Sequence, residues 1–283
     1  MEGLSKIYTG ERMIPEKDKE GPIYLEHMSR YSFASQFVTD KIVLDVACGV
    51  GYGSGFLRDQ KARRVIGVDY SKETISYAKQ VYQKEGVEFI VAEAENLPFE
   101  NESIDVIVSF ETIEHLHNQT KFLHEIKRLL KPDGILIIST PNSLVYPPTN
   151  VFHIKELDPE EFQTLLRNFF LNTKMYYQNT VLSNCIFSKD DLAETGPKIM
   201  LENFKLTSSE LWEAMYLIGI ASDTTLPKVT GVNTIFNDLE IKKLRNQLEA
   251  QKTIIETIYS SRGYKIITFL HKVRKSIPFL KNI

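Results

Sequence analysis

A glycine-rich turn after a short apolar run constrains the fold of this chain more than any other stretch. Residues 42–47 have the largely apolar character of a buried parallel strand, and glycines follow at positions 49, 51, 53 and 55. Residues 56–60 are compatible with a helix. A strand, a glycine loop and a helix in this order let backbone N–H groups approach a ligand closely, because no Cβ intervenes. The stretch therefore predicts a ligand-binding turn and argues against a tight turn without a ligand.

The spacing of the glycines separates two kinds of ligand. A dinucleotide fingerprint has glycine at its first, third and sixth positions, and Ser54 stands at the sixth position here. Asp45, four residues before Gly49, would be poorly placed beside a pyrophosphate and well placed to bind a cation. A dehydrogenase is therefore the weakest alternative, and the expected ligand carries an ammonium group and no phosphate.

Strands and helices alternate after this turn. Strands are expected over residues 64–69, 87–92, 104–109 and 135–140, with helices between them, and further strands near 173–180 and 214–221. The last of these is expected to be antiparallel. This alternation predicts an α/β protein with a mostly parallel, doubly wound sheet. Asp69 ends the second strand, twenty residues after Gly49, where a carboxylate can bond ribose hydroxyls; the alternative is a structural role beside Ser71, a candidate helix cap.

Three segments resemble class I S-adenosylmethionine (SAM) methyltransferases. The string D-V-A-C-G-V-G-Y-G from Asp45 resembles their motif I, and SAM fits the ligand described above. Residues 93–99 resemble the acid-Ala-x-x-Leu-Pro-Phe segment of the family, and residues 129–136 its Leu-Leu-Lys-Pro-Asp-Gly-Ile-Leu run. The resemblance covers residues 23–180 approximately and implies a seven-stranded Rossmann-like sheet with SAM as cofactor.

The resemblance also implies roles for single residues. Glu93, where the family usually has Asp, would accept a hydrogen bond from the adenine amino group, and Ala94 would offer its backbone N–H to the ring. Residues 23–39 are expected to form a helix that either packs on the sheet edge or covers the cofactor, with Arg30 facing its carboxylate. The predicted cofactor-binding residues are Arg30, Asp45, Ala47, Gly49, Gly51, Asp69, Tyr70, Glu93, Ala94 and Glu111.

Two acids and a histidine follow the fourth strand in the pattern Glu111-x-x-Glu114-His115. One interpretation makes His115 or a carboxylate a general base for a hydroxyl group. The other makes Glu111, Glu114, His115 and His153 the ligands of a divalent ion, with Zn²⁺, Mn²⁺, Fe²⁺ or Mg²⁺ as candidates. The pattern is similar to that of ubiquinone O-methyltransferases and small-RNA 2′-O-methyltransferases. The structural alternative is that Glu114 and His115 cap a turn while His153 only packs.

Composition limits the partners of the chain. Its 283 residues carry a net charge of −3, which disfavours nucleic acid as a partner. It has two cysteines, no apolar signal core at its start and no apolar stretch long enough to span a membrane, so a cytoplasmic location is expected.

Three parts are expected along the chain: an N-terminal cap or lid over residues 1–40, a methyltransferase domain over 41–230 with an insertion at 188–211, and a helical extension over 236–283. Apolar residues with heptad spacing at 239–258 predict either a coiled coil that makes homo-oligomers or a packed helix. Basic and apolar residues mix over 262–283, which predicts peripheral contact with the inner face of the cell membrane, or else a solvated tail or a protein-binding helix.

The acceptor is inferred from resemblance alone. Residues 9–15 and 24–31 resemble the lead-in of bacterial methyltransferases encoded with polysaccharide genes. The expected activity is O-methylation of a sugar hydroxyl in a bacterial surface glycan or in its nucleotide- or lipid-linked precursor. One alternative is a methyltransferase for a small phenol or quinone precursor. Another is an inactive SAM-binding scaffold in a membrane-associated complex for glycan assembly.

Overall fold

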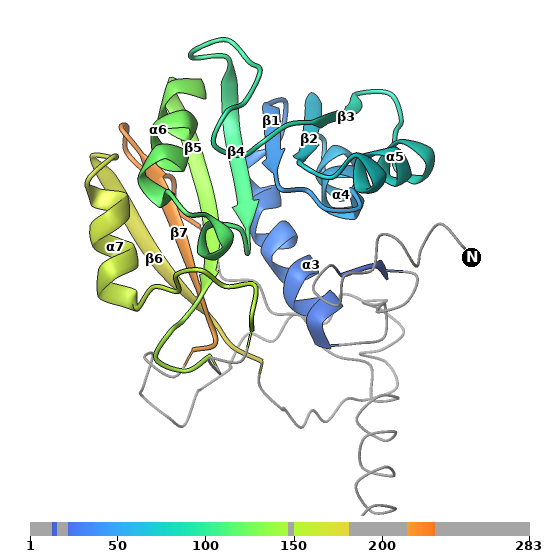
Figure 1. The fold of residues 1–283 in the computed structure, drawn as a ribbon. Helices are drawn as coiled ribbons and strands as arrows, with labels where there is room; N and C mark the ends of the chain where they lie inside the picture. The colour runs from blue at the N-terminus through green and yellow to red at the C-terminus, as the bar shows by residue number, and fades with distance from the viewer. Residues whose placement is uncertain (1–12, 16–21, 147–149, 181–213, 230–283) are drawn as a thin grey trace, which may run out of the picture. The chain divides into compact units, whose positions relative to one another are not determined.

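The computed structural model describes residues 13–15, 22–146, 150–180 and 214–229, which lie within one compact unit, residues 1–234. Seven strands form one sheet in the order β3-β2-β1-β4-β5-β7-β6 (Figure 1). The first five are mutually parallel, and β7 runs antiparallel to both β5 and β6. The predicted seven-stranded Rossmann-like sheet is confirmed. The strands are β1 (Ile42–Val46), β2 (Arg64–Asp69), β3 (Val87–Val91), β4 (Ile104–Phe110), β5 (Leu130–Pro141), β6 (Asn172–Gln178) and β7 (Tyr216–Ser222).

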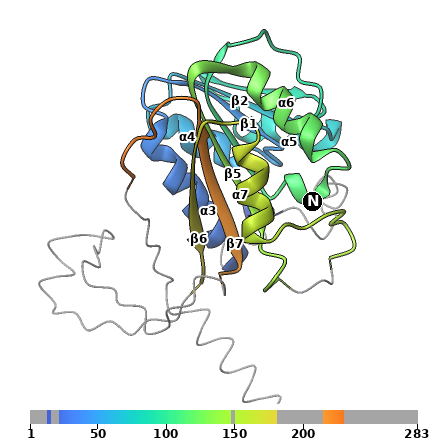
Figure 2. The same ribbon diagram turned by 90° about the vertical axis from the view of Figure 1, so that its left-hand side faces the viewer.

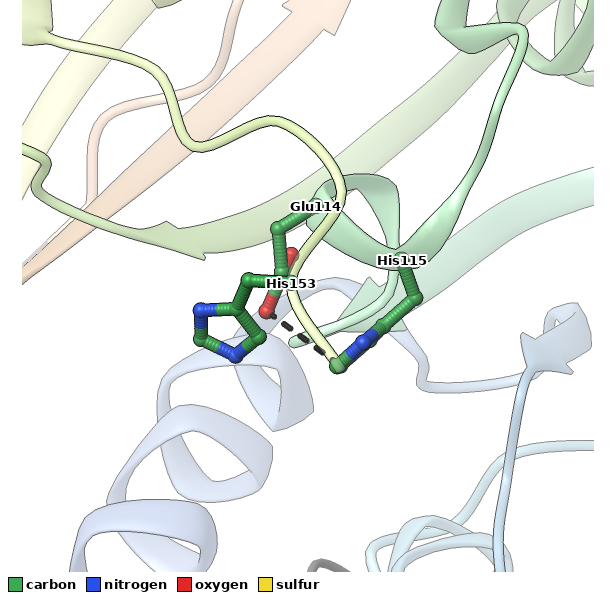
Figure 3. Close-up of side chains that lie close together, drawn as sticks. All are labelled: Glu114, His115 and His153. Atoms are coloured by element: carbon green, nitrogen blue, oxygen red, sulfur yellow. Dashed lines mark ion pairs between the residues drawn. The ribbon is translucent and has the colours of Figure 1, made fainter. Parts of the chain in front are cut away.

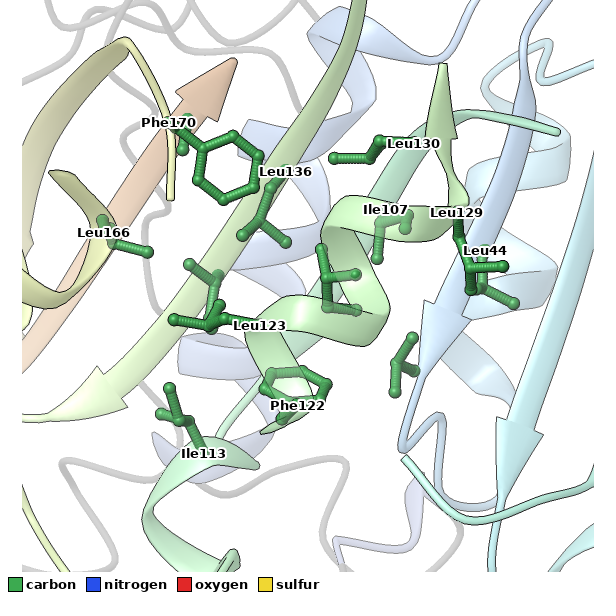
Figure 4. Close-up of a cluster of buried hydrophobic side chains, with 14 of the residues drawn as sticks. Leu44, Ile107, Ile113, Phe122, Leu123, Leu129, Leu130, Leu136, Leu166 and Phe170 are labelled. Atoms are coloured by element: carbon green, nitrogen blue, oxygen red, sulfur yellow. The ribbon is translucent and has the colours of Figure 1, made fainter. Parts of the chain in front are cut away.

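Helices cover both faces of the sheet (Figures 1 and 2). Successive strand residues point to opposite faces, so that Val43 packs toward α3 and α4 while Leu44 packs toward α6 and α7. Figure 4 shows the core on the side of α6 and α7, where Phe122 and Leu123 of α6 lie against Ile107 and the neighbouring strand residues. The helices are α3 (Pro22–Ala34), α4 (Tyr52–Asp59), α5 (Lys72–Val81), α6 (Gln119–Leu129) and α7 (Pro159–Arg167), with short 3-10 helices η1 (Ser35–Phe37) and η2 (Ile113–His115).

The chain reverses its direction across the sheet between β1 and β4. It moves outward from β1 to β3 and then returns to β4 on the other side of β1. In open parallel sheets, ligands bind outside the carboxyl ends of the strands at such a switch point. The glycine turn follows β1, and Glu111 follows β4, so both predicted site segments flank this point.

Several element boundaries differ from the sequence predictions. The helix expected over residues 23–39 ends at Ala34 and is followed by η1, and two further differences concern α4 and β5. Helix α4 begins at Tyr52, so Gly53 and Gly55 are helical rather than part of the loop. Strand β5 begins at Leu130 rather than at residue 135: Ile104 pairs with Leu130 and Val106 with Ile135, so residues 131–134 form an irregular bulge in the strand.

Several sequence predictions lie outside the described residues. These are the insertion at 188–211, the heptad segment at 239–258 and the basic stretch at 262–283. Within the described part of the chain, no helix combines the length and the apolar character that crossing a membrane requires.

Candidate functional site

The glycine turn has three residues in the left-handed region of φ: Ala47 at 61°, Gly49 at 55° and Gly51 at 91°. An alanine there is strained by roughly 1–2 kcal/mol, which marks a turn shape that the surrounding structure enforces. A Cβ built on Gly49 would meet no atom within 4 Å. The turn is therefore open at Gly49, where a ligand can approach the backbone.

The next two glycines serve packing. A Cβ on Gly51 would lie 2.6 Å from the ring of Phe89, and one on Gly53 would lie 1.9 Å from the ring of Tyr31. These close approaches explain why α4 can begin inside the glycine run. Glycine at 53 lets the Tyr31 side chain of α3 cross the start of α4 and reach Asp45.

Asp45 lies beneath the turn and is buried. The Tyr31 hydroxyl donates to both carboxylate oxygens at 3.2 and 3.3 Å, and the Ser54 hydroxyl donates to Oδ2 at 2.6 Å. Burial raises the pKa of Asp45 to about 7, although both hydroxyl groups oppose the rise. The carboxylate thus links α3 to the helix that follows the glycine turn. Its predicted contact with a ligand ammonium group stays a prediction.

This burial predicts a pH dependence of stability. The folded-state pKa of about 7 exceeds the ordinary value of 3.8, so the folded protein retains a proton that the unfolded chain releases. Asp45 therefore lowers the free energy of unfolding as the pH rises through this window. We therefore expect the free energy of unfolding of wild type to fall relative to that of D45N as the pH rises. From pH 5 to pH 8 the difference should change by on the order of 2 kcal/mol, as measured by urea unfolding at each pH.

Asp105 provides the matched control. Burial is outweighed there by hydrogen bonds from Lys131 and from the Ile42 N–H, so the pKa of Asp105 is lowered. Asp105 is fully ionised in both the folded and the unfolded state above the ordinary carboxyl pKa. The free energies of unfolding of D105N and wild type should therefore differ by a constant amount from pH 5 to pH 8. A D45N difference that is equally constant would contradict a raised pKa at Asp45.

Asp69 and Glu93 lie at the carboxyl ends of neighbouring strands. Asp69 is buried, and its carboxylate accepts hydrogen bonds from the N–H groups of Gly49 at 3.2 Å and Ser71 at 2.9 Å. Ser71 is the N-cap of α5, as predicted, and Asp69 ties that cap to the glycine turn. Tyr70 is 63% exposed, and Glu93 is exposed beyond the end of β3, next to the half-buried Ala94.

Arg30 is the largest side chain that is almost completely buried, with 1% exposure. Its Nε donates to the Gln178 side chain of β6 at 2.8 Å, and its guanidinium lies 4.3 Å from the centre of the Tyr216 ring of β7. Glu111 approaches one terminal nitrogen only to 3.9 Å. Both terminal nitrogens are buried and have no hydrogen-bond partner among the described residues. A buried guanidinium with unused donors calls for an anion, since each unsatisfied donor is costly.

Glu111 interacts with Ser139 rather than with the histidines. The Ser139 hydroxyl donates to Glu111 Oε1 at 2.6 Å and accepts from the Glu111 N–H at 3.2 Å. Glu111 has a φ of 51°, an uncommon value for a residue with a side chain. Of the four predicted metal ligands, the structure brings together the other three.

These three are Glu114, His115 and His153, whose candidate ligand atoms lie within 4.8 Å of one another (Figure 3). Glu114 and His115 come from η2, and His153 comes from the neighbouring loop. Glu114 is fully buried, and within the part of the chain that the structure describes its Oε1 has no hydrogen-bond partner. Burial raises the pKa of Glu114 well above its ordinary value, and the Glu111 carboxylate adds to the rise. A cation beside Glu114 would counter both effects.

Hydrogen bonds indicate the tautomers of both histidines. His115 Nδ1 lies 3.1 Å from the Phe152 carbonyl oxygen, which can only accept, so Nδ1 carries the proton. His153 Nδ1 lies 2.5 Å from Glu156 Oε1 and donates to it, while Nε2 accepts from the Asn150 amide at 2.8 Å. In the neutral form, each ring therefore has its lone pair on Nε2. A carboxylate behind a histidine, as Glu156 is here, is a common support for metal-binding histidines.

Sequence reasoning missed the residues that support these groups. Tyr31, which donates to Asp45, carries no cofactor-binding motif, and Ser54 enters the sequence argument only as the residue that interrupts the dinucleotide spacing. Gln178 and Tyr216, which hold Arg30, carry no motif and lie far from it in the sequence.

Several known proteins similar to this chain are methyltransferases by name. Residues 44–138 match the family described as "Methyltransferase domain". A Mycobacterium tuberculosis protein named "probable S-adenosylmethionine-dependent methyltransferase" is 37% identical over 163 residues, 56% of this chain and 58% of that protein. The "phthiotriol/phenolphthiotriol dimycocerosates methyltransferase" of Mycobacterium leprae is 36% identical over 100 residues, 35% of this chain and 37% of that protein. The chain thus spans less than two thirds of the length of these relatives.

The fold has solved counterparts. A chain from the Haloferax volcanii complex that contains the Trm112 methyltransferase activator aligns with a TM-score of 0.57 and 17% identity, over 79% of this chain and 98% of that chain. The family match begins in β1, contains the glycine turn, Asp69 and Glu114, and ends in β5. This segment is therefore similar to SAM-dependent methyltransferase domains, and the likeness supports SAM as the cofactor.

Proposed function

We propose that the chain transfers the methyl group of SAM to a sugar hydroxyl, in a bacterial surface glycan or in its nucleotide- or lipid-linked precursor, with the help of a divalent metal ion. The observation that carries this proposal is the convergence of Glu114, His115 and His153 after β4. Strand β4 lies next to β1 in the sheet, and the glycine turn follows the carboxyl end of β1.

The residues present fit the parts of SAM. The unbonded guanidinium nitrogens of Arg30 suit the carboxylate of the methionine moiety, and the open backbone at Gly49 leaves room for the cofactor. Asp69 would hold the ribose hydroxyls, with Tyr70, Glu93 and Ala94 near the adenine. Asp45, Ala47, Gly51 and Glu111 would shape this site, and Glu111 also balances the charge of Arg30. Bound SAM supplies a methyl group on a positively charged sulfur.

The residues present also fit a divalent ion. Glu114 Oε1 would meet a positive charge that its buried position lacks, and His115 Nε2 and His153 Nε2 would be the nitrogen ligands. Asn150 would release the His153 nitrogen that it now bonds. A bound ion lowers the pKa of a hydroxyl group that it contacts and can hold a vicinal diol. The remaining task of the protein is to fix that oxygen in line with the methyl group and to accept its proton.

A second mechanism assigns the proton to His115 directly. The Phe152 carbonyl holds the His115 ring in the tautomer with the lone pair on Nε2, which is the form that a general base requires. His153 would then be a neighbour of the base, with its ring centre 4.9 Å from that of His115.

Two other functions remain alternatives. A phenol or quinone precursor would serve as acceptor if the site had an apolar surface beside it, and the Mycobacterium leprae relative is named for lipids that contain a triol. A SAM-binding scaffold without turnover would need the same cofactor residues and would not need the histidines.

Turnover by the purified protein tests the proposal. Formation of S-adenosylhomocysteine (SAH) would be measured with a panel of methyl glycosides, after treatment with EDTA and after addition of Mg²⁺, Mn²⁺ or Zn²⁺. We expect EDTA to abolish the sugar-dependent rate and a metal to restore it, and we expect H153A to lose at least about tenfold of that rate. A rate that resists EDTA would overturn the metal role and leave the base mechanism. Turnover with phenols alone, or SAM binding without turnover, would favour the two alternatives.

A further inference from the structure

The described parts of the 142–157 loop, residues 142–146 and 150–157, are fastened to the body of the domain at the base of the loop and again at residues 154 and 155. Asn142 and Leu157 form a parallel β-bridge, and the Ser143 N–H donates to the Leu157 carbonyl at 3.2 Å. Farther along, the N–H groups of Ile154 and Lys155 both donate to the Glu114 carbonyl, at 2.8 and 3.1 Å. The loop therefore lies along η2 by specific backbone bonds.

Large apolar side chains of this loop face solvent. Nine large hydrophobic side chains are exposed in the described part of the chain, and four of them lie in this loop: Leu144, Val151, Phe152 and Ile154, at 62%, 87%, 48% and 47% exposure. Single exposed apolar residues need no explanation, but a concentration of them on one loop marks a binding surface.

Backbone contacts place this loop beside Glu114, His115 and His153, the candidate acceptor site. Phe152, through its carbonyl, positions His115, and the next residue is His153 itself. An acceptor whose hydroxyl reaches Glu114, His115 and His153 must therefore pass close to the 142–157 loop. A molecule with a polar end at the histidines and an apolar part along the loop would use both features.

We propose that the acceptor is an amphiphile whose hydrocarbon part binds Leu144, Val151, Phe152 and Ile154 while its sugar lies at the histidines. This inference rests on the proposed function and selects the lipid-linked precursor among its acceptors. A membrane surface would need cationic side chains around the apolar ones. The described part of the loop has Lys155 and the acidic Glu156, so it has no excess of positive charge.

Two glucosides that differ only in chain length test this proposal. Binding of octyl β-D-glucopyranoside, below its critical micelle concentration, and of methyl β-D-glucopyranoside would be measured by titration calorimetry on the SAH-loaded protein. We expect the octyl compound to bind at least about tenfold more tightly, since burial of each methylene group is favourable. The double variant V151S/F152S should reduce that ratio to below about threefold.

Leu171 offers the matched control, because it is 82% exposed and lies just before β6, outside the loop. L171S should keep the ratio of wild type. Equal affinities of wild type for the two glucosides, or an unchanged ratio in V151S/F152S, would overturn the inference even if methyl glucoside is methylated. If neither compound binds, the sugar acceptor and this inference fall together. Vesicles of phosphatidylethanolamine and phosphatidylglycerol test the other source of hydrocarbon. If V151S/F152S lost binding to these vesicles and kept the wild-type ratio of glucoside affinities, the loop would be assigned to a membrane surface instead.

Discussion

H115A is expected to lower kcat for methyl transfer by about 10²–10⁴-fold, the usual contribution of a group that moves a proton in the transition state. Both proposed mechanisms lose their central group in this variant. In one, the metal loses a nitrogen ligand from η2; in the other, the hydroxyl loses its base. The affinity for SAH should stay within about twofold, because the cofactor residues lie on other elements. Single-turnover kinetics and calorimetry would measure the two quantities.

His117 gives the control for this variant. It is exposed and lies two residues after His115 in the same segment, and H117A should retain kcat. A similar loss in both variants would indicate that the segment had been disturbed rather than that a specific nitrogen acts. An H115A enzyme with wild-type kcat would remove His115 from both mechanisms.

R30M is expected to weaken SAH binding by about 10- to 100-fold, because hydrogen bonds to a charged group contribute about 1.5–3 kcal/mol each. The affinity for 5′-methylthioadenosine should not change, because this compound lacks the carboxylate that Arg30 would bind. Titration calorimetry with both compounds separates loss of one contact from general damage. Equal weakening of both ligands would contradict a carboxylate site at Arg30.

D69A provides the complementary pattern within the same experiment. Asp69 is placed at the nucleoside end, so D69A should weaken SAH and 5′-methylthioadenosine to a similar degree, again by about 10- to 100-fold. Glu73, an exposed acid in the first turn of α5, is the matched control, and E73A should bind both compounds like wild type. Selective loss of SAH binding in D69A would contradict the ribose role.

Much of the fold could be predicted from the sequence because the central strands are nearly continuous apolar runs with clear breaks. Ser71 was recognisable as a helix cap, and its side chain accepts a hydrogen bond from the N–H of Thr74. The start of α4 could not be predicted, because the reason for it is tertiary. The Tyr31 ring packs directly against Gly53, where a Cβ would collide with it, so this glycine serves packing within the helix rather than a loop. Nothing near Gly53 in the sequence signals that contact.

The part of the candidate site around Gly49 and Asp69 could be predicted better from the sequence than the part around Arg30. Acids and glycines at strand ends carry a local pattern, so Asp69 and Gly49 could be identified by spacing alone. The environment of Arg30 depends on Gln178 and Tyr216, which are brought to it only by the antiparallel pair β6 and β7. Glu111 was predicted with the metal ligands because it shares their motif, but its left-handed backbone directs it to Ser139 instead.

The contacts of Arg30 have a consequence for how the protein is made. Its partners stand 148 residues away at Gln178 and later still at Tyr216, so the arginine emerges from the ribosome long before they do. The surroundings of Arg30 therefore cannot form until β7 has been synthesised and inserted between β5 and β6. A nascent chain released before β7 would accordingly leave this arginine without the groups that hold it in the folded protein.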